Sequence, residues 1–504
     1  MGYYFISVGG SGARVLESLT HLCVAGLMPN QEKEGHLYVM SIDPDTGNGN
    51  LTRTGTLLNC LNKFQDVQVG KGTPLLKTPL RLPKPFFWSP AKLDTNLDRV
   101  ISYQHYSEQP IGKLYESLYT KKERQTILNE GFRGRPSIGA AVMGLKAKAD
   151  VESAFHNLID AVKSDVQTNG SAQIFLAGSV FGGTGAAGLP TIARILRENR
   201  ELKQHCQEGK IRIGGALLLP YFSFAPTAQQ KKESGLFASS DNFLTNTKAA
   251  LRYYSDTGGS GYDSMYFVGD ETMLPMPVFS VGAANQRNDA HIVDFFAAMA
   301  AVHFYCGNEG KHCYYISREK DRVFQWQDLP DVTMYDDTKV SVREYFVQFT
   351  RFILAYLHIV KPVLPNLANG KEPAHAHPWY KDYWKDKIDV NASDVRNFEQ
   401  YAEQFVVWLD QVEHSAGARS VELINPKVFS TKNNQAKIMP DFFSTMDYGN
   451  GKVNINEVRA RLARGKRRKR SITEMIFGSK KDTESTEEGF GLFLRRLYDS
   501  CASN

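Results

Sequence analysis

The sequence lacks closely spaced cysteine pairs, which excludes the usual cysteine frameworks of disulfide and zinc proteins. None of the six cysteines forms a C-x-x-C pair. Scattered cysteines favour reduced thiols in an intracellular protein over a disulfide framework. Cys306 and Cys313 flank His312 in "CGNEGKHC", but a zinc site needs a fourth ligand that the sequence does not supply. We therefore interpret these three as loop residues.

Long hydrophobic runs are also missing. No stretch approaches the roughly 18 to 20 consecutive apolar residues that a membrane-spanning helix needs. The opening "MGYYFISVGG" lacks the basic region of a signal peptide, and Ile6 stands where a myristoylation signal has Ser or Thr. The sequence therefore predicts a soluble, cytoplasmic protein.

Little net charge is present for a chain of 504 residues, and much of it is concentrated near the C-terminus. The formal charge is +6, and residues 459–470 ("RARLARGKRRKR", Arg459 to Arg470) contain only basic charges. Such a block is typical of a solvated tail. Binding of this tail to DNA, an anionic membrane surface or an adaptor protein stays open as an alternative.

The length exceeds the roughly 250 to 300 residues at which one core stops growing, so we expect several domains. Strand-like and helix-like segments alternate over the first 220 residues, which predicts an α/β fold with a parallel sheet covered by helices. We expect a nucleotide-binding domain at 1–255 with an insertion over the sheet at about 51–126, a second, smaller α+β domain at 256–450, and a basic tail at 451–504.

Two glycine-rich turns each follow a predicted strand and precede a predicted helix. One has Gly10, Ser11 and Gly12, and the other has Gly182, Gly183, Thr184 and Gly185. Glycine lets backbone N–H groups approach an anion at the positive end of the helix dipole. Each turn is therefore a candidate phosphate cradle, although plain strand-to-helix turns also use glycine.

Neither turn matches a common nucleotide motif in full. Both lack the G-K-[ST] ending that places a lysine on the phosphates of Walker A proteins. The first turn partly fits the G-x-G-x-x-G pattern of dinucleotide-binding proteins, but Val15 replaces its third glycine. The first acid at a strand end, Asp43, also comes later than the roughly 20 residues usual for ribose recognition. An NAD(P)-dependent oxidoreductase stays open as the weaker alternative.

Six segments, in order along the chain, resemble those of the tubulin and FtsZ superfamily of nucleotide-hydrolysing filament proteins. "GGTGAAGLPTIA" is similar to the signature loop GGGTGSG, with Phe181 in place of the first glycine. The collinear order carries the resemblance, which covers residues 1–300 and is closest to divergent bacterial tubulin-like proteins. The other five segments are "VGGSGARV", "SIDPD", "GRPSIGAA", "LPYFSF" and "NTKAAL".

The resemblance implies that the chain binds GTP or GDP with Mg²⁺. The first turn would hold the α- and β-phosphates, and the second would wrap the β- and γ-phosphates. Pro136 belongs to a third nucleotide loop, and Asn246, or alternatively Asn242, would contact the base. Asp43 and Asp45 end the second strand, where they either hold Mg²⁺ through water or cap a turn.

The resemblance also implies that an acidic loop of one subunit completes hydrolysis on the next. The candidate is "GAANQRNDAHIVD", in which Asn288, Asp289 and Asp294 are the predicted catalytic residues and His291 a helper. Asp289 has an alternative role as a helix N-terminal acid. The match is weakest here, because "SDTGGSGYDSMYFVGD" interrupts the long helix that should lead into this loop.

We therefore expect a GTP-hydrolysing protein that assembles head to tail into filaments. A nucleotide-gated interaction module of the same fold that does not polymerise is the main alternative. His375 and His377 form an H-x-H pair without a visible third ligand, so we interpret them as loop histidines.

Overall fold

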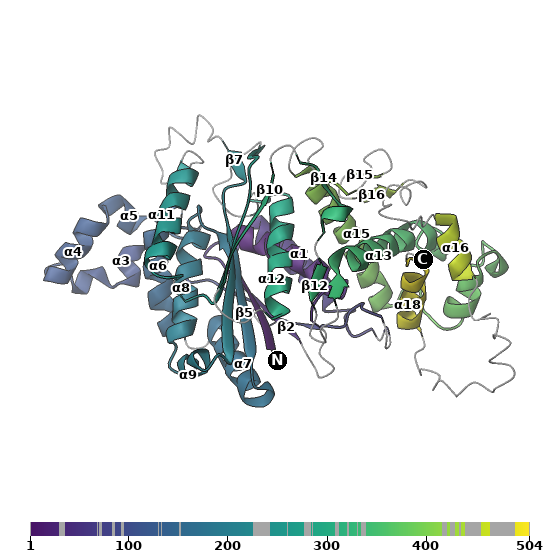
Figure 1. Cartoon of the computed structure of the whole chain (residues 1–504), viewed down its shortest axis with the longest axis horizontal. Helices are drawn as coiled ribbons and strands as arrows, with labels where there is room; N and C mark the ends of the chain where they lie inside the picture. The colour runs from purple at the N-terminus through teal and green to yellow at the C-terminus, as the bar shows by residue number, and fades with distance from the viewer. Residues whose placement is uncertain are drawn as a thin grey trace.

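The chain folds around one large parallel sheet with helices on both faces (Figure 1). The computed structural model describes residues 2–502 apart from a set of short and long gaps, which are 30–35, 68, 70–72, 83–85, 92–94, 130, 133, 151–152, 225–241, 260, 277–283, 285, 308–311, 320–321, 330, 334–338, 416–420, 424–428, 433–434, 439–454 and 464–488. No helix in these described ranges is long and apolar enough to cross a bilayer.

The eight strands of the sheet run in the order β10-β8-β6-β5-β1-β2-β3, with β4 also pairing with β2. Strand order reverses between β1 and β5, as in doubly wound folds, which confirms the predicted fold class. Ligands bind such sheets outside the carboxyl ends of the strands, near this reversal. The strands are β1 (Gly2–Val8), β2 (Leu37–Ile42), β3 (Leu80–Arg81), β4 (Phe87–Trp88), β5 (Ala172–Ser179), β6 (Ile211–Leu218), β8 (Ser264–Asp270) and β10 (His312–Arg318).

Both faces of the central strands are buried, so these strands read as nearly continuous apolar runs. Tyr3 and Phe5 of β1 point into one core, and Tyr4 and Ile6 point into the other. The first core contains α1 (Gly9–Val24) and α12 (Ile292–Tyr305). The second face is covered by α6 (Pro136–Ala149), α7 (Ala154–Asn169), α8 (Thr184–Glu198), α9 (Lys203–Gln207) and α11 (Phe243–Asp256).

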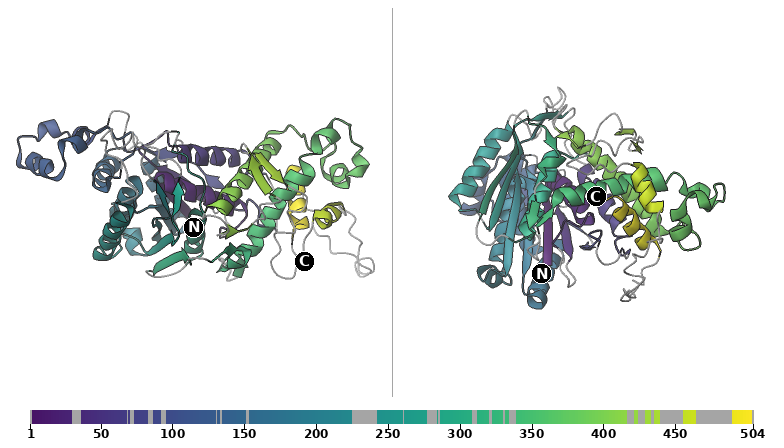
Figure 2. Two further views of the ribbon diagram at one scale, coloured as in Figure 1. Left: turned by 90° about the horizontal axis from the view of Figure 1, so that it is seen from above. Right: turned by 45° about the vertical axis from the view of Figure 1, so that its right-hand side comes forward.

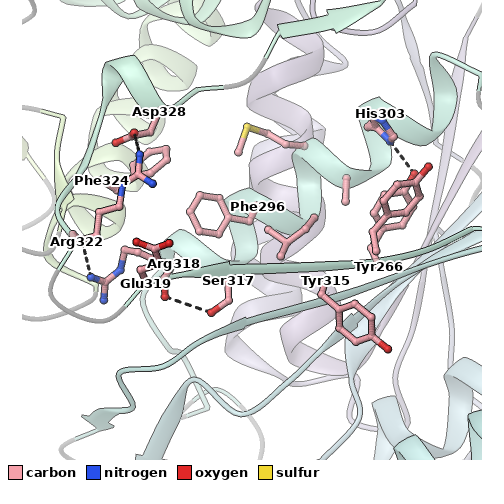
Figure 3. Close-up of a pocket in the computed structure, with 14 residues that line it drawn as sticks. Tyr266, Phe296, His303, Tyr315, Ser317, Arg318, Glu319, Arg322, Phe324 and Asp328 are labelled. Carbon is pink, nitrogen blue, oxygen red and sulfur yellow. Dashed lines mark hydrogen bonds and ion pairs between the residues drawn. The ribbon is translucent and has the colours of Figure 1, made fainter.

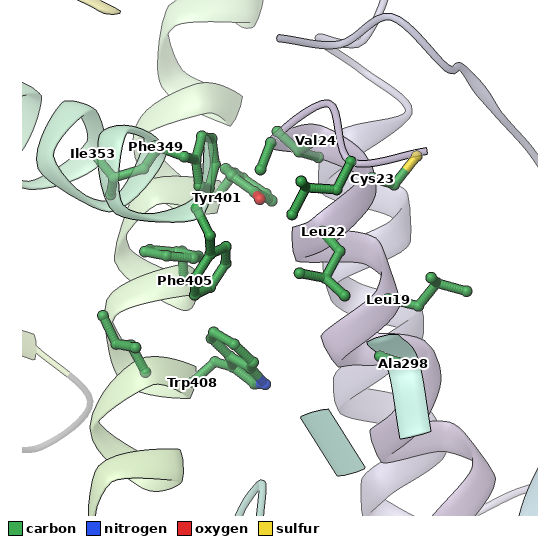
Figure 4. Close-up of a cluster of buried hydrophobic side chains, with 14 of the residues drawn as sticks. Leu19, Leu22, Cys23, Val24, Ala298, Phe349, Ile353, Tyr401, Phe405 and Trp408 are labelled. Carbon is green, nitrogen blue, oxygen red and sulfur yellow. The ribbon is translucent and has the colours of Figure 1, made fainter. Parts of the chain in front are cut away.

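A helical region from the C-terminal half packs on the far side of α1 (Figures 1 and 2). Aromatic side chains of α15 (Ser393–His414) and α13 (Val342–Ala355) face the apolar side of α1 (Figure 4). Trp408 donates a hydrogen bond to the Ser18 hydroxyl at 3.1 Å. Around this core lie η5 (Tyr356–Val360), α14 (Leu364–Ala368), η6 (Ala374–Ala376), η7 (Tyr380–Trp384), α16 (Ile455–Ala463) and α18 (Phe490–Ser500).

Short elements complete the described chain. Three pairs of strands lie outside the main sheet: β7 (Phe222–Phe224) with β9 (Leu274–Met276), β11 (Phe324–Gln325) with β14 (Val421–Glu422), and β12 (Asp331–Thr333) with β13 (Lys339–Ser341). A fourth pair is β15 (Phe429–Lys432) with β16 (Gln435–Ile438). The remaining helical turn is η4 (Trp326–Asp328).

The predicted insertion at 51–126 is wrong over its first part. Residues 49–61 form α2 (Gly49–Leu61), which packs against α1 in the core, and β3 and β4 extend the sheet. The segment that projects from the body is shorter (Figure 1, left). It contains α3 (Leu97–Val100), η1 (Tyr103–His105), α4 (Pro110–Leu118) and α5 (Lys121–Gln125).

The predicted boundary at residue 255 also fails, because β8 and β10 continue the same sheet as far as Arg318. The helix between them, α12, is buried almost throughout, whereas α11 buries only Phe243, Thr247 and Tyr254. The central buried helix is therefore α12, and "NTKAAL" lies on a more exposed one. The basic tail predicted at 451–504 is wrong for its last part, because α18 buries Phe493 and Leu497 in the core. The basic block at 459–470 is described only as far as residue 463, in α16.

Candidate functional site

The two glycine turns lie side by side at one edge of the sheet. Strands β1 and β5 pair in parallel, so their carboxyl ends emerge together. A Cβ atom built on Gly9 would lie 3.3 Å from the Cβ of Thr184 and 3.6 Å from the backbone N of Gly185. The predicted convergence of the two turns is therefore present in the fold.

Three helices present uncapped N-termini at this edge. Helices α1, α6 and α8 each have no side-chain cap and no acid in the first turn. The turn before α6 adjoins the second glycine turn, because a Cβ on Gly183 would lie 2.8 Å from the backbone N of Gly134. Free N–H groups at helix N-termini bind anions. The arrangement therefore offers converging donors to an extended anion, with Pro136 at the start of α6.

The glycines divide into two groups with different roles. A Cβ on Gly12 would lie 2.4 Å from the carbonyl oxygen of Ala177, and one on Gly185 would lie 2.3 Å from that of Ser179. These two buried glycines therefore allow the helices to pack closely on the strands. Gly10, Gly182 and Gly183 are partly exposed, together with Ser11 and Thr184, and these are the positions that a ligand can reach.

Asp43 and Asp45 are both buried beside the first turn, at 3% and 4% exposure. Asp43 accepts a hydrogen bond from the Asp45 N–H at 3.0 Å, and Asp45 accepts one from the Gly47 N–H at 3.1 Å. The turn-capping role is thus realised in this structure. Burial raises the pKa of Asp43 to about 8. A bound cation is one means of holding this carboxyl in its charged form, and a magnesium ion would suit two oxygens at a strand end.

The two base-contact candidates on α11 differ in position. Asn246 donates a hydrogen bond from Nδ2 to the carbonyl oxygen of Phe181 at 3.2 Å, so its amide adjoins the second glycine turn. Asn242 is exposed and occupies the N-cap position of α11 without capping it. The geometry brings Asn246, rather than Asn242, to the edge where the turns meet.

The predicted catalytic loop lies at the same edge as the glycine turns of its own chain. Asn48 donates to the Gln286 side chain at 3.0 Å, and the Asn288 N–H donates to the Asn50 side chain at 2.8 Å. A Cβ on Gly10 would lie 3.1 Å from the side-chain amides of Asn48 and Asn50. From this loop α12 runs back across the sheet to the start of β10.

This placement corrects the predicted trans role of Asn288, Asp289 and Asp294. In a head-to-tail stack, one edge of a subunit meets the opposite edge of the next. A loop beside its own phosphate cradle therefore cannot reach the cradle of the neighbour. Asp289 is exposed at this edge, and the Asn288 carbonyl accepts a hydrogen bond from Arg53 at 2.7 Å.

Asp294 is fully buried in a polar network that the sequence did not reveal. Its carboxylate pairs with Arg14 Nε at 2.9 Å and accepts the Tyr221 hydroxyl at 2.8 Å. Arg14 also donates to the Ser11 hydroxyl at 3.5 Å, which connects the network to the first glycine turn. The sequence signal for this network was an arginine near the start of α1, in a helix whose neighbouring residues are apolar or small.

Two of the histidines that the sequence singled out have partners within the chain. His291 caps α12 by accepting the Val293 N–H, and burial lowers its pKa to about 3. His377 pairs with Glu372 at 3.2 Å, and both side chains are partly exposed. Within the described ranges, no group of three His, Cys, Asp or Glu residues is arranged to hold a metal ion.

Neither a protein-family model nor a curated protein sequence matches this chain. Solved structures do match: CetZ from Methanosaeta thermophila strain DSM 6194 has 14% identity over 60% of this chain, with a TM-score of 0.23. CetZ2 from Haloferax volcanii, described as a GTPγS-bound protofilament, has 12% identity over 61%, with a TM-score of 0.27. The chain spans 53% and 60% of these two proteins.

Proposed function

We propose that the protein binds a nucleoside triphosphate across the two glycine turns. The supporting observation is the contact between Gly9 and the Thr184–Gly185 step, which joins the N-termini of α1 and α8 into one cradle. Ser11 and Thr184 would add hydroxyl donors to the backbone amides. The choice of guanine as the base rests on the motif resemblance. Asn246 is the side chain that would contact it.

We propose hydrolysis of this nucleotide as the reaction, with assembly of the chain into a filament as its setting. Phosphoryl transfer depends mainly on positioning and charge stabilisation. Magnesium, when bound, would neutralise phosphate charge, and Asp43 and Asp45 would hold it through water. The exposed carboxylate of Asp289 is the cis candidate for orienting the attacking water.

A dinucleotide-binding oxidoreductase shares the strand order of this sheet but fits the edge less well. Such proteins hold the ribose with an accessible acid at the end of the second strand. Here the first acid at that strand end, Asp43, comes later after Gly10 than the roughly 20 residues usual for the ribose acid. The second glycine turn would also have no role in that function.

The test is binding of a fluorescent GTP analogue to the full chain and to Gly182→Val. A side chain at residue 182 would meet only the Ser179 hydroxyl at 3.0 Å, so the fold should tolerate it while the cradle is filled. We expect affinity to fall at least about tenfold, because the β- and γ-phosphates lose their approach to the amides.

Gly144→Val on α6 is the matched control. A Cβ there meets no atom within 4 Å and lies outside the cradle. Equal binding by Gly182→Val and the native chain would contradict the proposal.

Two further measurements separate the alternatives. A change in nicotinamide fluorescence on mixing with NADH, without GTP binding, would favour the oxidoreductase instead. Scattering with GTP and a slowly hydrolysed analogue separates a filament from a non-polymerising module.

A further inference from the structure

Strand β10 ends the sheet with an open edge. The His312 N–H donates to the Asp263 carbonyl at 2.9 Å, so this residue faces β8. Because ladder groups alternate along a strand, Cys313, Tyr315 and Ser317 direct their backbone N–H and C=O groups to the other side. No strand in the described ranges pairs with that side.

This edge carries none of the usual protection against strand pairing. Proteins protect edges with lysine, proline, bulges or inward charges. Within β10 only Arg318 is a permanent charge, and it is held in a buried ion pair with Asp270 at 3.0 Å. Tyr315, at the centre of the strand, is 77% exposed. The strand is therefore chemically open to a partner strand.

A cavity of about 450 Å³ runs along the same edge (Figure 3). Phe296, Met299 and His303 line it at helical spacing on α12, so they form one face of that helix. Tyr314 and Ile316 of β10 contribute from the strand. Helix α12 packs over β6 and β8, and its Phe296 and Met299 form the apolar inner wall of the cavity beside β10.

We propose that β10 pairs antiparallel with β10 of a second copy of this chain, about a two-fold axis at Tyr315. Tyr315 then faces its own equivalent, and Tyr314 faces Ile316 of the second copy on the cavity side. Cys313 faces Ser317 on the other side. The strand fits itself because no like charges meet within it, and because Tyr314 and Ile316 of each copy would extend the apolar lining of the other copy's cavity at its open side.

The pairing joins two sheets into one continuous layer with both α12 helices on the same face. An axis perpendicular to the sheet keeps facing residues on the same side, which directs Tyr314 and Ile316 of each copy towards the open side of the other copy's cavity. This inference is independent of the proposed nucleotide function, and its test contains no nucleotide.

The decisive experiment uses opposite charges at the axis, with mass measured by sedimentation of the full chain. Native protein should sediment as a dimer of twice 56.5 kDa. Tyr315→Lys alone and Tyr315→Glu alone should each weaken dimerisation about tenfold or more, because like charges face one another. An equimolar mixture of the two should recover the dimer.

Tyr253→Lys is the matched control, since this tyrosine is 38% exposed on α11 and lies away from the edge. Recovery in the mixture also shows that the charged variants are folded. A native chain that stays monomeric would overturn the proposal, and so would a dimer that Tyr315→Lys does not weaken. Either result would mean that the β10 edge is not used by a second copy of this chain.

Ser317→Cys tests the register independently. Facing residues that exchange two hydrogen bonds have Cα atoms about 5.5 Å apart, within disulfide range. The new cysteine should therefore form an intermolecular disulfide with native Cys313 under mild oxidation. Within one chain these positions lie four residues apart on an extended strand, which is too far for a bond. Absence of a covalent dimer where sedimentation shows a dimer would contradict this register.

Discussion

Arg14 is the residue that connects the glycine edge to the rest of the protein. It lies in the second turn of α1 and contacts Asp294 of α12, Tyr221 and Ser11. Both members of the ion pair are almost fully buried, at 2% and 0% side-chain exposure. Removing one partner from such a pair leaves a buried charge without compensation.

We therefore expect Arg14→Met to lower the free energy of unfolding by about 3–5 kcal/mol. Urea unfolding followed by tryptophan fluorescence measures the change. Arg14→Met combined with Asp294→Leu should recover part of the loss, because no lone charge remains. Arg135→Met, which breaks an exposed pair with Glu123, is the control and should cost no more than about 1 kcal/mol. Equal losses for Arg14→Met and this control would contradict the assignment.

Asp43 gives a pH-dependent prediction. Its pKa is raised by burial to about 8, against an ordinary value of 3.8. Between these values the folded state binds more protons than the unfolded state, so Asp43 lowers stability as pH rises through this window. Asp43→Asn should therefore raise the melting temperature increasingly from pH 4 to pH 8.

Asparagine retains the oxygen that accepts the Asp45 N–H, so the turn itself should persist. Asp289→Asn, at the exposed position on the same edge, should show no such increase. A constant difference in melting temperature across the range would count against a raised pKa. Binding of magnesium nucleotide next to Asp43 should release a proton at pH 7, because a cation lowers the pKa of a neighbouring carboxyl.

At the scale of elements, α1 connects two parts of the chain that are distant in sequence. Its N-terminus lies at the glycine edge, and its flank packs against α15 (Figure 4). In this contact His21 packs against Tyr401, Phe405 and Trp408. Burial lowers the pKa of His21 to about 3, so this histidine stays neutral in the apolar contact. The contact therefore consists of apolar packing and two hydrogen bonds, one between Trp408 and Ser18 and one between His21 and Tyr401.

Trp408→Ala should lower the free energy of unfolding by about 3–5 kcal/mol, because it empties a large buried site and leaves the Ser18 hydroxyl without this donor. Urea unfolding again measures it. Leu118→Ala on α4, where the leucine is 66% exposed, should change stability by less than about 0.5 kcal/mol. A small loss for Trp408→Ala would show that α15 contributes little to the stability of α1.

Elements were predictable where local pattern decides them. The apolar runs of β1, β5 and β6 identified these strands, and the glycines after β1 and β5 identified the two turns. Strand β10 was not predicted from the sequence. In "HCYYISR" exposed and partly buried residues alternate, and the run has little apolar bias. Helix α2 was hidden in the 51–126 segment, because the Lys- and Pro-rich residues after it dominated the composition.

At the scale of the whole molecule, the sequence predicted that two turns converge but not which other segments join them. The side on which residues 286–294 lie depends on the direction of α12 relative to the sheet, and no local pattern records that direction. Burial of Asp294 by Arg14 likewise depends on a contact across 280 positions of sequence. Long-range topology, rather than local chemistry, limited the prediction of the site.

The sixteen residues of α1 form a rod about 24 Å long, at 1.5 Å per residue. Close-packed protein interiors deform little, so a tilt of α1 at the glycine edge would also displace its C-terminal end. Helix α1 therefore couples the glycine edge mechanically to the C-terminal helices that pack on its flank.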